Sequence, residues 1–344
     1  MKKTSVLWAL SFAVIVLLLL TAGDAISTSP SPRAYHQMVY DPNLGKVILY
    51  GGQTGEWNPP ENFSHETWFF DPITNVWTIM LEEDSETNPG GGIGGDMAYD
   101  SKDKLSILSV ISDDLKELQT WAYDASTNAW EQLANVPRAP MLGQRIAYDS
   151  ESDRIIMFGG FDMTKYQLVN ETWVYDYNTD IWTNMRPSGN PHGRNYHGMA
   201  YDPKADRIVV WGGDIKGPSK KELVWTYDFN TNTWQKFKYD NGPTNRDYIN
   251  LVYDDIAESF IVYGGYPYGN DETWVYKLST NTWQLMQPAN NPGLLSRYAM
   301  VYAQNVDRTI LFGGQDGSVS INFTAETWSY NLDNNSWTNL SPAP

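Results

Sequence analysis

Short hydrophobic runs alternate with turn residues along most of the chain. The clearest copy lies at residues 196–237, where four runs read YHGMAYD, DRIVVWGG, LVWTYD and TNTWQKF. These runs are rich in aromatic and β-branched residues and are bounded by Asp, Asn, Gly or Pro, which is typical of strands joined by tight turns. After residue 25 no stretch of ten residues shows the 3.6-residue period of an amphipathic helix. The sequence therefore predicts an all-β protein.

A pair of tryptophans nine residues apart occurs six times. The second Trp of each pair recurs after 49 to 54 residues, with a mean spacing of 52. The pairs are Trp68/Trp77, Trp121/Trp130, Trp173/Trp182, Trp225/Trp234, Trp274/Trp283 and Trp328/Trp337. One four-stranded sheet of about 50 residues cannot bury both of its faces, whereas sheets stacked around an axis cover one another. We therefore expect residues 33–344 to form a six-bladed β-propeller of four-stranded antiparallel blades.

A double glycine ends the second predicted strand in five of the six repeats. Because the backbone turns there where a neighbouring segment packs close, a Cβ atom would collide. The five copies are Gly51-Gly52, Gly159-Gly160, Gly212-Gly213, Gly264-Gly265 and Gly313-Gly314. The second repeat has residues 108–113 (LSVISD) at this position. We expect its blade to be present but distorted.

A double glycine, an aromatic strand and a Trp about nine residues further on resemble the Kelch repeat. The resemblance covers residues 33–344 and implies an axial channel, with binding loops after the double glycines and before the innermost strands. Kelch propellers serve as adaptors, sugar-processing enzymes and cell-surface proteins, so the fold alone does not define the function. The sequence leaves open whether the ring closes by side-chain packing or by a strand exchanged between the termini.

The first 25 residues have the features of an export signal. Lys2 and Lys3 precede an apolar run from Val6 to Ala22, and small residues follow up to Ala25. We expect a signal peptide over residues 1–25 and a Ser/Pro linker over residues 26–32, with an uncleaved membrane anchor as the alternative. Both place the propeller outside the cytoplasm, as a secreted, periplasmic or cell-surface protein. Association with a membrane is expected only if the segment stays uncleaved.

Composition narrows the possible chemistry. The chain carries 24 Lys+Arg against 41 Asp+Glu, a net charge of −17, which argues against a nucleic-acid partner. It has no Cys, which excludes disulfides and thiolate metal sites, as well as the Tyr–Cys crosslink of the copper oxidases built on Kelch propellers. We predict no metal and no cofactor, and we expect a monomer.

The candidate ligand-binding residues lie just before the innermost predicted strands, near one mouth of the channel. The resemblance implies that arginines there bind acidic peptides, and the forked guanidinium suits carboxylates. The aromatic and imidazole rings that follow suit peptide contacts or sugar stacking. The alternatives are that the arginines bond carbonyls within the fold or balance local acids, and that the rings fill the inner ends of the blades. The residues concerned are Arg33, Tyr35, His36, Arg194, Tyr196, His197, Arg246, Tyr248 and Arg297. The second and third repeats have Gly92 and Met141 at the arginine position, so the set is incomplete.

The loops that follow the double glycines are the second candidate region. Their aromatic residues Trp57, Tyr166, Tyr266 and Tyr268 are predicted ligand contacts. Five Asn-x-Ser/Thr sequons, at Asn62, Asn170, Asn322, Asn334 and Asn339, are possible glycosylation sites in an exported chain.

No nucleophile with a paired base, close carboxylate pair or metal cluster shows a recognisable spacing. We therefore interpret the chain as a non-catalytic scaffold that binds a protein or glycan ligand. The alternative is a carbohydrate-active isomerase of the sialic-acid epimerase type or another copper-free sugar-processing propeller, which a carboxylate beside an Arg in the channel would favour. A third reading is a purely structural surface module.

Overall fold

The computed structural model describes residues 29–341 except 57, 59–60, 84–87, 91, 216–222, 268–269 and 318–321. The predicted signal segment 1–25 lies outside the described residues. Within the described residues, no helix has the length and apolar character needed to span a membrane. The helical element in this part of the chain is the 3-10 turn η1 (Leu278–Thr280).

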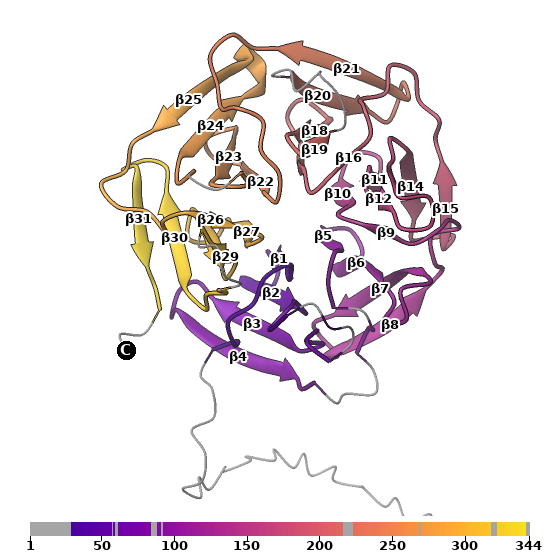
Figure 1. Ribbon diagram of the computed structural model, residues 1–344, viewed down its shortest axis with the longest axis horizontal. Coiled ribbons are helices and arrows are strands. Elements are labelled where there is room, and N and C mark those ends of the chain that lie inside the picture. Colours follow the sequence, from indigo (N-terminus) through magenta and orange to yellow (C-terminus); the bar gives the residue numbers. More distant parts are fainter. Residues whose placement is uncertain are drawn as a thin grey trace, which may run out of the picture.

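The described strands form six four-stranded antiparallel sheets around a common axis (Figure 1). In each sheet the strands follow chain order from the axis outward. The first three sheets contain β1 (Gln37–Asp41), β2 (Lys46–Tyr50), β3 (Thr67–Asp71) and β4 (Val76–Leu81); β5 (Asp96–Asp100), β6 (Leu105–Ile111), β7 (Leu118–Asp124) and β8 (Ala129–Leu133); and β10 (Arg145–Asp149), β11 (Arg154–Phe158), β14 (Thr172–Asp176) and β15 (Ile181–Asn184).

The other three sheets have the same order. They contain β17 (Gly198–Asp202), β18 (Arg207–Trp211), β20 (Leu223–Asp228) and β21 (Thr233–Lys238); β22 (Leu251–Asp254), β23 (Ser259–Tyr263), β24 (Thr273–Lys277) and β25 (Thr282–Met286); and β27 (Ala299–Ala303), β28 (Arg308–Phe312), β30 (Thr327–Asn331) and β31 (Ser336–Asn339). The predicted all-β fold is confirmed.

Two-residue strands join the loop after a double glycine to the segment before an innermost strand. These short antiparallel pairings hold in place the loops that form the site described below. The pairs are β9 (Met141–Leu142) and β13 (Gln167–Leu168) on either side of β12 (Phe161–Asp162), β16 (Arg194–Asn195) with β19 (Asp214–Ile215), and β26 (Leu295–Ser296) with β29 (Gln315–Asp316). In the first and fifth sheets, single bridges at Ala34–Gln53 and Asp247–Tyr266 occupy the same place.

The second tryptophan of each pair ties its sheet to the preceding one. In five sheets the indole Nε1 donates a hydrogen bond of 2.9–3.0 Å to a threonine hydroxyl on the third strand of the preceding sheet. The fifth sheet differs, because Val224 stands where the others have Thr and Nε1 of Trp283 is buried without a hydrogen-bond partner in the described residues. The five bonds are Trp77–Thr327, Trp130–Thr67, Trp182–Thr120, Trp234–Thr172 and Trp337–Thr273.

The Trp77–Thr327 hydrogen bond is part of the interface that closes the ring. It joins the first sheet to the last, and the innermost strands β1 and β27 lie side by side (Figure 1). A hydrophobic cluster fills this interface, as similar clusters fill the other five, and it includes Val47, Trp68 and Phe312. The first and last sheets each consist of strands that are local in the sequence, so no strand is exchanged between them. They meet through side chains and through backbone hydrogen bonds of the loops before β1, such as Gly314 N–H to Arg33 C=O at 2.8 Å.

The second sheet corrects one expectation. It is regular rather than distorted, and β6 and β7 are its longest strands, with seven residues each. Without a double glycine, β6 continues its pairing with β7 as far as Ile111 opposite Leu118. In the first sheet, by contrast, Gly51 has a φ of +70° and leaves the strand where a Cβ atom would collide with the carbonyl oxygen of Gly92.

Candidate functional site

Six equivalent residues, one before each innermost strand, form a belt around the axis. All have left-handed φ values between +51° and +70°, and they are Tyr35, Gly94, Gly143, Tyr196, Tyr248 and Arg297. Backbone hydrogen bonds link neighbours in the belt: Tyr35 N–H donates to Arg297 C=O at 2.9 Å, and Tyr196 N–H donates to Gly143 C=O at 2.8 Å. Position 143 requires glycine, because a Cβ atom there would lie 2.8 Å from the ring of Tyr196.

The side chains of this belt close the channel. The rings of Tyr196 and Tyr248 are 4.3 Å apart, and that of Tyr35 lies 5.9 and 5.8 Å from them. The Arg297 guanidinium stacks 4.2 Å from the Tyr248 ring centre, and its Nε donates to the Tyr35 hydroxyl at 2.5 Å. We call these four side chains the Tyr–Arg layer. The predicted tyrosines of the first, fourth and fifth repeats therefore meet on the axis.

A cavity of about 620 Å³ lies on the loop side of the Tyr–Arg layer. We call it the mouth cavity, and its size is in the usual range for ligand pockets. It lies between the loops of the fourth and fifth sheets, and it combines aromatic rings with carboxylate, amide and guanidinium groups. Its lining residues are Gly213, Asp214, Ile215, Asn245, Arg246, Asp247, Tyr248, Tyr266, Pro267 and Arg297.

Three of the predicted arginines are buried in their own sheets. Nη1 of each donates to the carbonyl oxygen of the first residue of its double glycine, at 3.0 Å for Arg33, 2.9 Å for Arg194 and 3.0 Å for Arg246. Nη2 of Arg33 pairs with Glu66 at 2.7 Å, and Nη2 of Arg246 pairs with Glu272 at 2.8 Å. In these two sheets the guanidinium is therefore neutralised inside the fold, as the alternative interpretation expected.

Arg194 has no such partner among the residues that the structure describes. Leu223 stands at the position that Glu66 and Glu272 occupy, two residues before the first tryptophan of the pair. No carboxylate of the described residues lies within ion-pair distance of Arg194, whose side chain is only 3% exposed. Burial lowers the pKa of Arg194 to about 10. The fourth sheet thus contains a buried cation that nothing in the described chain neutralises.

Arg297 is not equivalent to the other three arginines. It lies five residues before Tyr302, as Tyr35 lies five before Tyr40, so the residue that matches Arg33 in the sixth repeat is Leu295. The expected set of four equivalent arginines is therefore corrected to three buried arginines and one member of the Tyr–Arg layer.

The two histidines fill the inner ends of the sheets. His36 packs edge-on against Phe312 at 5.4 Å, and His197 packs in the same way against Phe158 at 5.6 Å. Burial, with a smaller effect from the charge of Arg33, lowers the pKa of His36 to about 3. Burial also lowers the pKa of His197 well below its usual value. Both rings are therefore neutral and contact neighbouring sheets, rather than the mouth cavity.

Of the four aromatic loop residues predicted to contact a ligand, one lines the mouth cavity. Tyr266 lines the mouth cavity, is 38% exposed and meets Tyr248 edge-on at 6.3 Å. Tyr166 is 76% exposed and packs on Phe161, away from that lining. Trp57 and Tyr268 lie outside the described residues. Of the sequon asparagines, Asn170, Asn322, Asn334 and Asn339 are exposed and Asn62 is half-buried.

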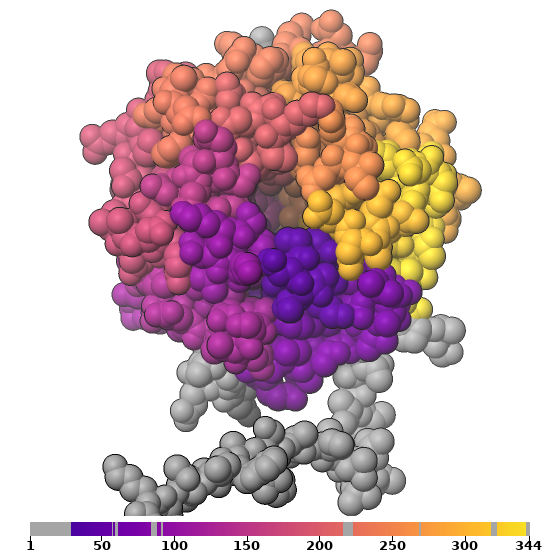
Figure 2. All heavy atoms as spheres, turned by 180° about the vertical axis from the view of Figure 1, so that it is seen from behind, coloured from indigo at the N-terminus to yellow at the C-terminus, as the bar shows by residue number. Residues whose placement is uncertain are grey.

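A second cavity, of about 380 Å³, lies on the axis beyond the Tyr–Arg layer and is lined by the innermost strands and their turns. We call it the axial cavity; the view from behind shows the ring hollowed at its centre (Figure 2). Arg145 separates the two cavities, because its Nε and Nη2 donate to the carbonyl oxygens of His197 at 2.9 Å and Ile249 at 2.8 Å. Its Nη1 lies 3.4 Å from Asp96 Oδ1. This carboxylate–arginine pair was not predicted by residue.

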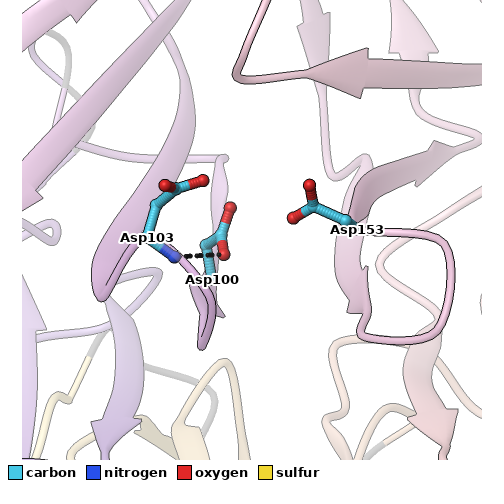
Figure 3. Close-up of side chains that lie close together, drawn as sticks. All are labelled: Asp100, Asp103 and Asp153. Atoms are coloured by element: carbon cyan, nitrogen blue, oxygen red, sulfur yellow. Dashed lines mark hydrogen bonds between the residues drawn. The ribbon is translucent and has the colours of Figure 1, made fainter.

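The turns at the far end of the axial cavity carry groups of carboxylates. Oxygens of Asp100, Asp103 and Asp153, from neighbouring sheets, lie within 4.8 Å of one another (Figure 3). Such oxygens are the ligands that Ca²⁺ and Mg²⁺ prefer. However, Asp100 already accepts the turn N–H groups of residues 102 and 103, and Asp153 pairs with Lys102 and accepts from Tyr148. These contacts give Asp100 and Asp153 a structural role in the turns.

Comparison with known proteins agrees with this architecture. The family described as the KLHDC2/KLHL20/DRC7 Kelch-repeats domain matches residues 19–204 and 203–343. The chain belongs to the Kelch-repeat family. Mei4-dependent protein 6 of Schizosaccharomyces pombe is 24% identical over 206 residues, which are 53% of this chain and 28% of that protein. Kelch-like protein 15 of Mus musculus is 24% identical over 159 residues, 45% of this chain and 25% of that protein, and its Danio rerio counterpart is 29% identical over 126 residues, 35% and 20%. The matched part thus spans 20–28% of the length of these relatives.

Proposed function

We propose that this chain is a six-bladed protein-interaction scaffold that holds an acidic peptide segment of its partner at the mouth cavity. Kelch-repeat propellers typically mediate protein interactions, and the family match supports this general role. The particular ligand chemistry follows from the residues around the mouth cavity.

The observation that carries the proposal is the buried charge of Arg194, which no carboxylate of the described residues neutralises. A buried ion without a partner costs several kcal/mol, so such charges are normally paired. In the first and fifth sheets a glutamate supplies the partner, whereas the fourth sheet has Leu223 in its place. A carboxylate from a bound protein therefore fits the position that Glu66 and Glu272 occupy in their sheets.

Arg194 is connected to the mouth cavity through the β16–β19 ribbon. It does not itself line the cavity, but it pairs in register with Ile215, and residues 213–215 are part of the lining. Tyr266 offers a half-exposed ring, and Asn245 and Asp247 offer polar groups for the backbone of an extended peptide. A peptide could thus place an acidic side chain at Arg194 and an apolar neighbour against Tyr248 and Tyr266.

An array of peptides and glycans, probed with the purified chain, tests the proposal. Peptides containing Asp or Glu should be retained, and the same peptides with Asn or Gln should not. Arg194→Met should weaken binding by at least about tenfold, because a hydrogen bond to a charged group is worth about 1.5–3 kcal/mol. Retention of glycans alone, or equal binding by Arg194→Met, would refute it.

Arg246→Met is the matched control for stability. It leaves Glu272 without its guanidinium, so the free energy of unfolding should fall by about 2 kcal/mol. Arg194→Met removes a guanidinium that bonds to carbonyl oxygens but to no carboxylate of the described residues, so the free energy of unfolding should fall less. Loss of binding with little loss of stability separates a ligand-binding role of Arg194 from a structural one.

We also propose export of the chain as a monomer through the segment 1–25. The basic start, apolar run and small residues support this assignment. In a host that glycosylates, the exposed Asn170, Asn322, Asn334 and Asn339 are acceptor positions. Mass spectrometry of the chain from the culture medium should find an N-terminus after Ala25. A chain retained in the cytoplasm with its leader intact would reject export.

A further inference from the structure

The axial cavity lies inside the ring of innermost strands and is open at one end. All six innermost strands line it, and exposed turn residues such as Ser101, Ser150 and Gln304 surround its open end. Arg145 crosses the other end, where its guanidinium bonds to carbonyl groups of two other sheets. Its volume of about 380 Å³ lies in the range of small-molecule sites.

The wall of the cavity alternates between apolar and hydrogen-bonding surface. Each innermost strand is an edge strand of its sheet, so one row of its N–H and C=O groups has no ladder partner among the described strands. Met199, Val252 and Met300 pack into the clusters between the sheets, and the more exposed lining residues Pro42, Tyr148 and Pro203 supply apolar surface beside these rows. A ligand that combines C–H faces with many hydroxyl groups matches such a wall better than a purely apolar one.

The inner end of the cavity supplies fixed polar groups. Asp96 Oδ2 accepts the N–H of Ile146 at 2.9 Å, and Asp96 Oδ1 lies 3.4 Å from Arg145 Nη1. The side chains of Asp96 and Arg145 keep 13% and 14% of their surface exposed, and both line the cavity. Asn250 also lines it, and its Oδ1 is buried without a hydrogen-bond donor in the described residues. A donor from a ligand would satisfy this oxygen.

The charges of the lining define the class of ligand. Asp96 and Arg145 cancel one another at the inner end, and Asp255, in the turn after β22 at the open end, adds a negative charge, so an anionic ligand is disfavoured. Adjacent acceptor and donor groups suit the two hydroxyls of a vicinal diol, each of which donates one hydrogen bond and accepts others. The geometry points to the axial cavity as a binding site for a small uncharged polyol of the size of a monosaccharide.

This site is independent of the proposed peptide site. The Tyr–Arg layer and Arg145 separate the axial cavity from the mouth cavity, and the two open toward opposite ends of the ring. A polyol therefore binds whether or not an acidic peptide does. Failure of one proposal leaves the other standing.

Saturation-transfer NMR and calorimetry on the purified chain test the site. The probes are the methyl glycosides of glucose, galactose, mannose and N-acetylglucosamine, together with myo-inositol; spermidine and glucuronate serve as cationic and anionic comparisons. At least one neutral probe should bind with a dissociation constant of about 1 mM or lower. If no neutral probe binds, or spermidine or glucuronate binds more tightly than all of them, the proposal is wrong.

Four variants locate the binding. Asp96→Asn should weaken it about tenfold, since a hydrogen bond to a charged acceptor is lost. Asn250→Ala should weaken it several-fold with an unchanged thermal midpoint, because its Oδ1 makes no hydrogen bond in the described chain. Ser150→Trp, at an exposed turn residue of the open end, should abolish it by obstruction. The control Tyr266→Ala, at the mouth cavity, should leave it unchanged. Binding that survives Ser150→Trp, or that is lost in Tyr266→Ala, would place the ligand elsewhere and overturn the proposal.

Discussion

Replacing Thr327 with valine removes the hydroxyl group that accepts a hydrogen bond from Trp77 across the closing interface. Both side chains are buried, with 3% and 7% of their surface exposed, and the bond measures 2.9 Å. Valine has nearly the same shape, so the packing is kept while the indole N–H loses its acceptor. A buried donor without a partner costs about 1–3 kcal/mol, and the free energy of unfolding should fall by that amount.

The fifth sheet offers the reverse experiment within the same chain. Val224 is fully buried at the equivalent position, and Nε1 of Trp283 has no hydrogen-bond partner in the described residues. Val224→Thr supplies the hydroxyl that five other interfaces use. The free energy of unfolding should therefore rise by about 1 kcal/mol, the net value of a buried hydrogen bond.

Urea unfolding followed by tryptophan fluorescence measures both effects. Thr172→Val, at an interior interface with Trp234, is the control for Thr327→Val. Equal losses for these two variants mean that the closing interface is built like the others. The reasoning fails if Thr327→Val leaves the midpoint unchanged, or if Val224→Thr destabilises the protein as much as Thr327→Val does.

Two further predictions concern the ends of the strands. Burial alone would lower the pKa of His65, but bonds to Asp113 at 3.1 Å and Glu83 at 3.3 Å outweigh it and raise that pKa to about 9. The stabilisation from these ion pairs is complete below the unfolded pKa of about 6.5 and is lost as the pH rises toward 9. Discounted for partial exposure, it amounts to about 1 kcal/mol. Urea midpoints should therefore fall over this pH range in the parent chain and stay flatter in His65→Gln. Gly143→Ala places a Cβ atom 2.8 Å from the Tyr196 ring at a φ of +70°, so it should lower the thermal midpoint by several degrees, and an unchanged midpoint would argue against the belt.

The sequence predicted the sheets because their determinants are local. Each sheet needs its own aromatic strands and its own Asp- or Asn-containing turns, and these recur with the tryptophan pairs. The close backbone approach at the double glycines was also predicted from the sequence, and Gly51 shows it, since its backbone lies against the next repeat. The expectation of a distorted second sheet was wrong because it treated the glycines as a requirement of the strands rather than of the loop that follows them.

The candidate site was only partly predictable because its residues meet across repeats. Arg297 was assigned to the arginine position, although its distance from Tyr302 matches that of Tyr35 from Tyr40. Aligning the repeats on this strand tyrosine would have found the error. The contact of Asp96 with Arg145 joins two sheets at the axis, and no spacing within one repeat could indicate it.

A crystal structure of the chain with an acidic peptide selected from the array would show whether Arg194 binds a carboxylate of its partner. We expect a peptide carboxylate within about 3 Å of Arg194 Nη2, where Glu66 and Glu272 stand in their own sheets, with the rest of the peptide in the mouth cavity. A peptide bound at the strand turns, or one in the mouth cavity whose carboxylates leave Arg194 unpaired, would contradict it.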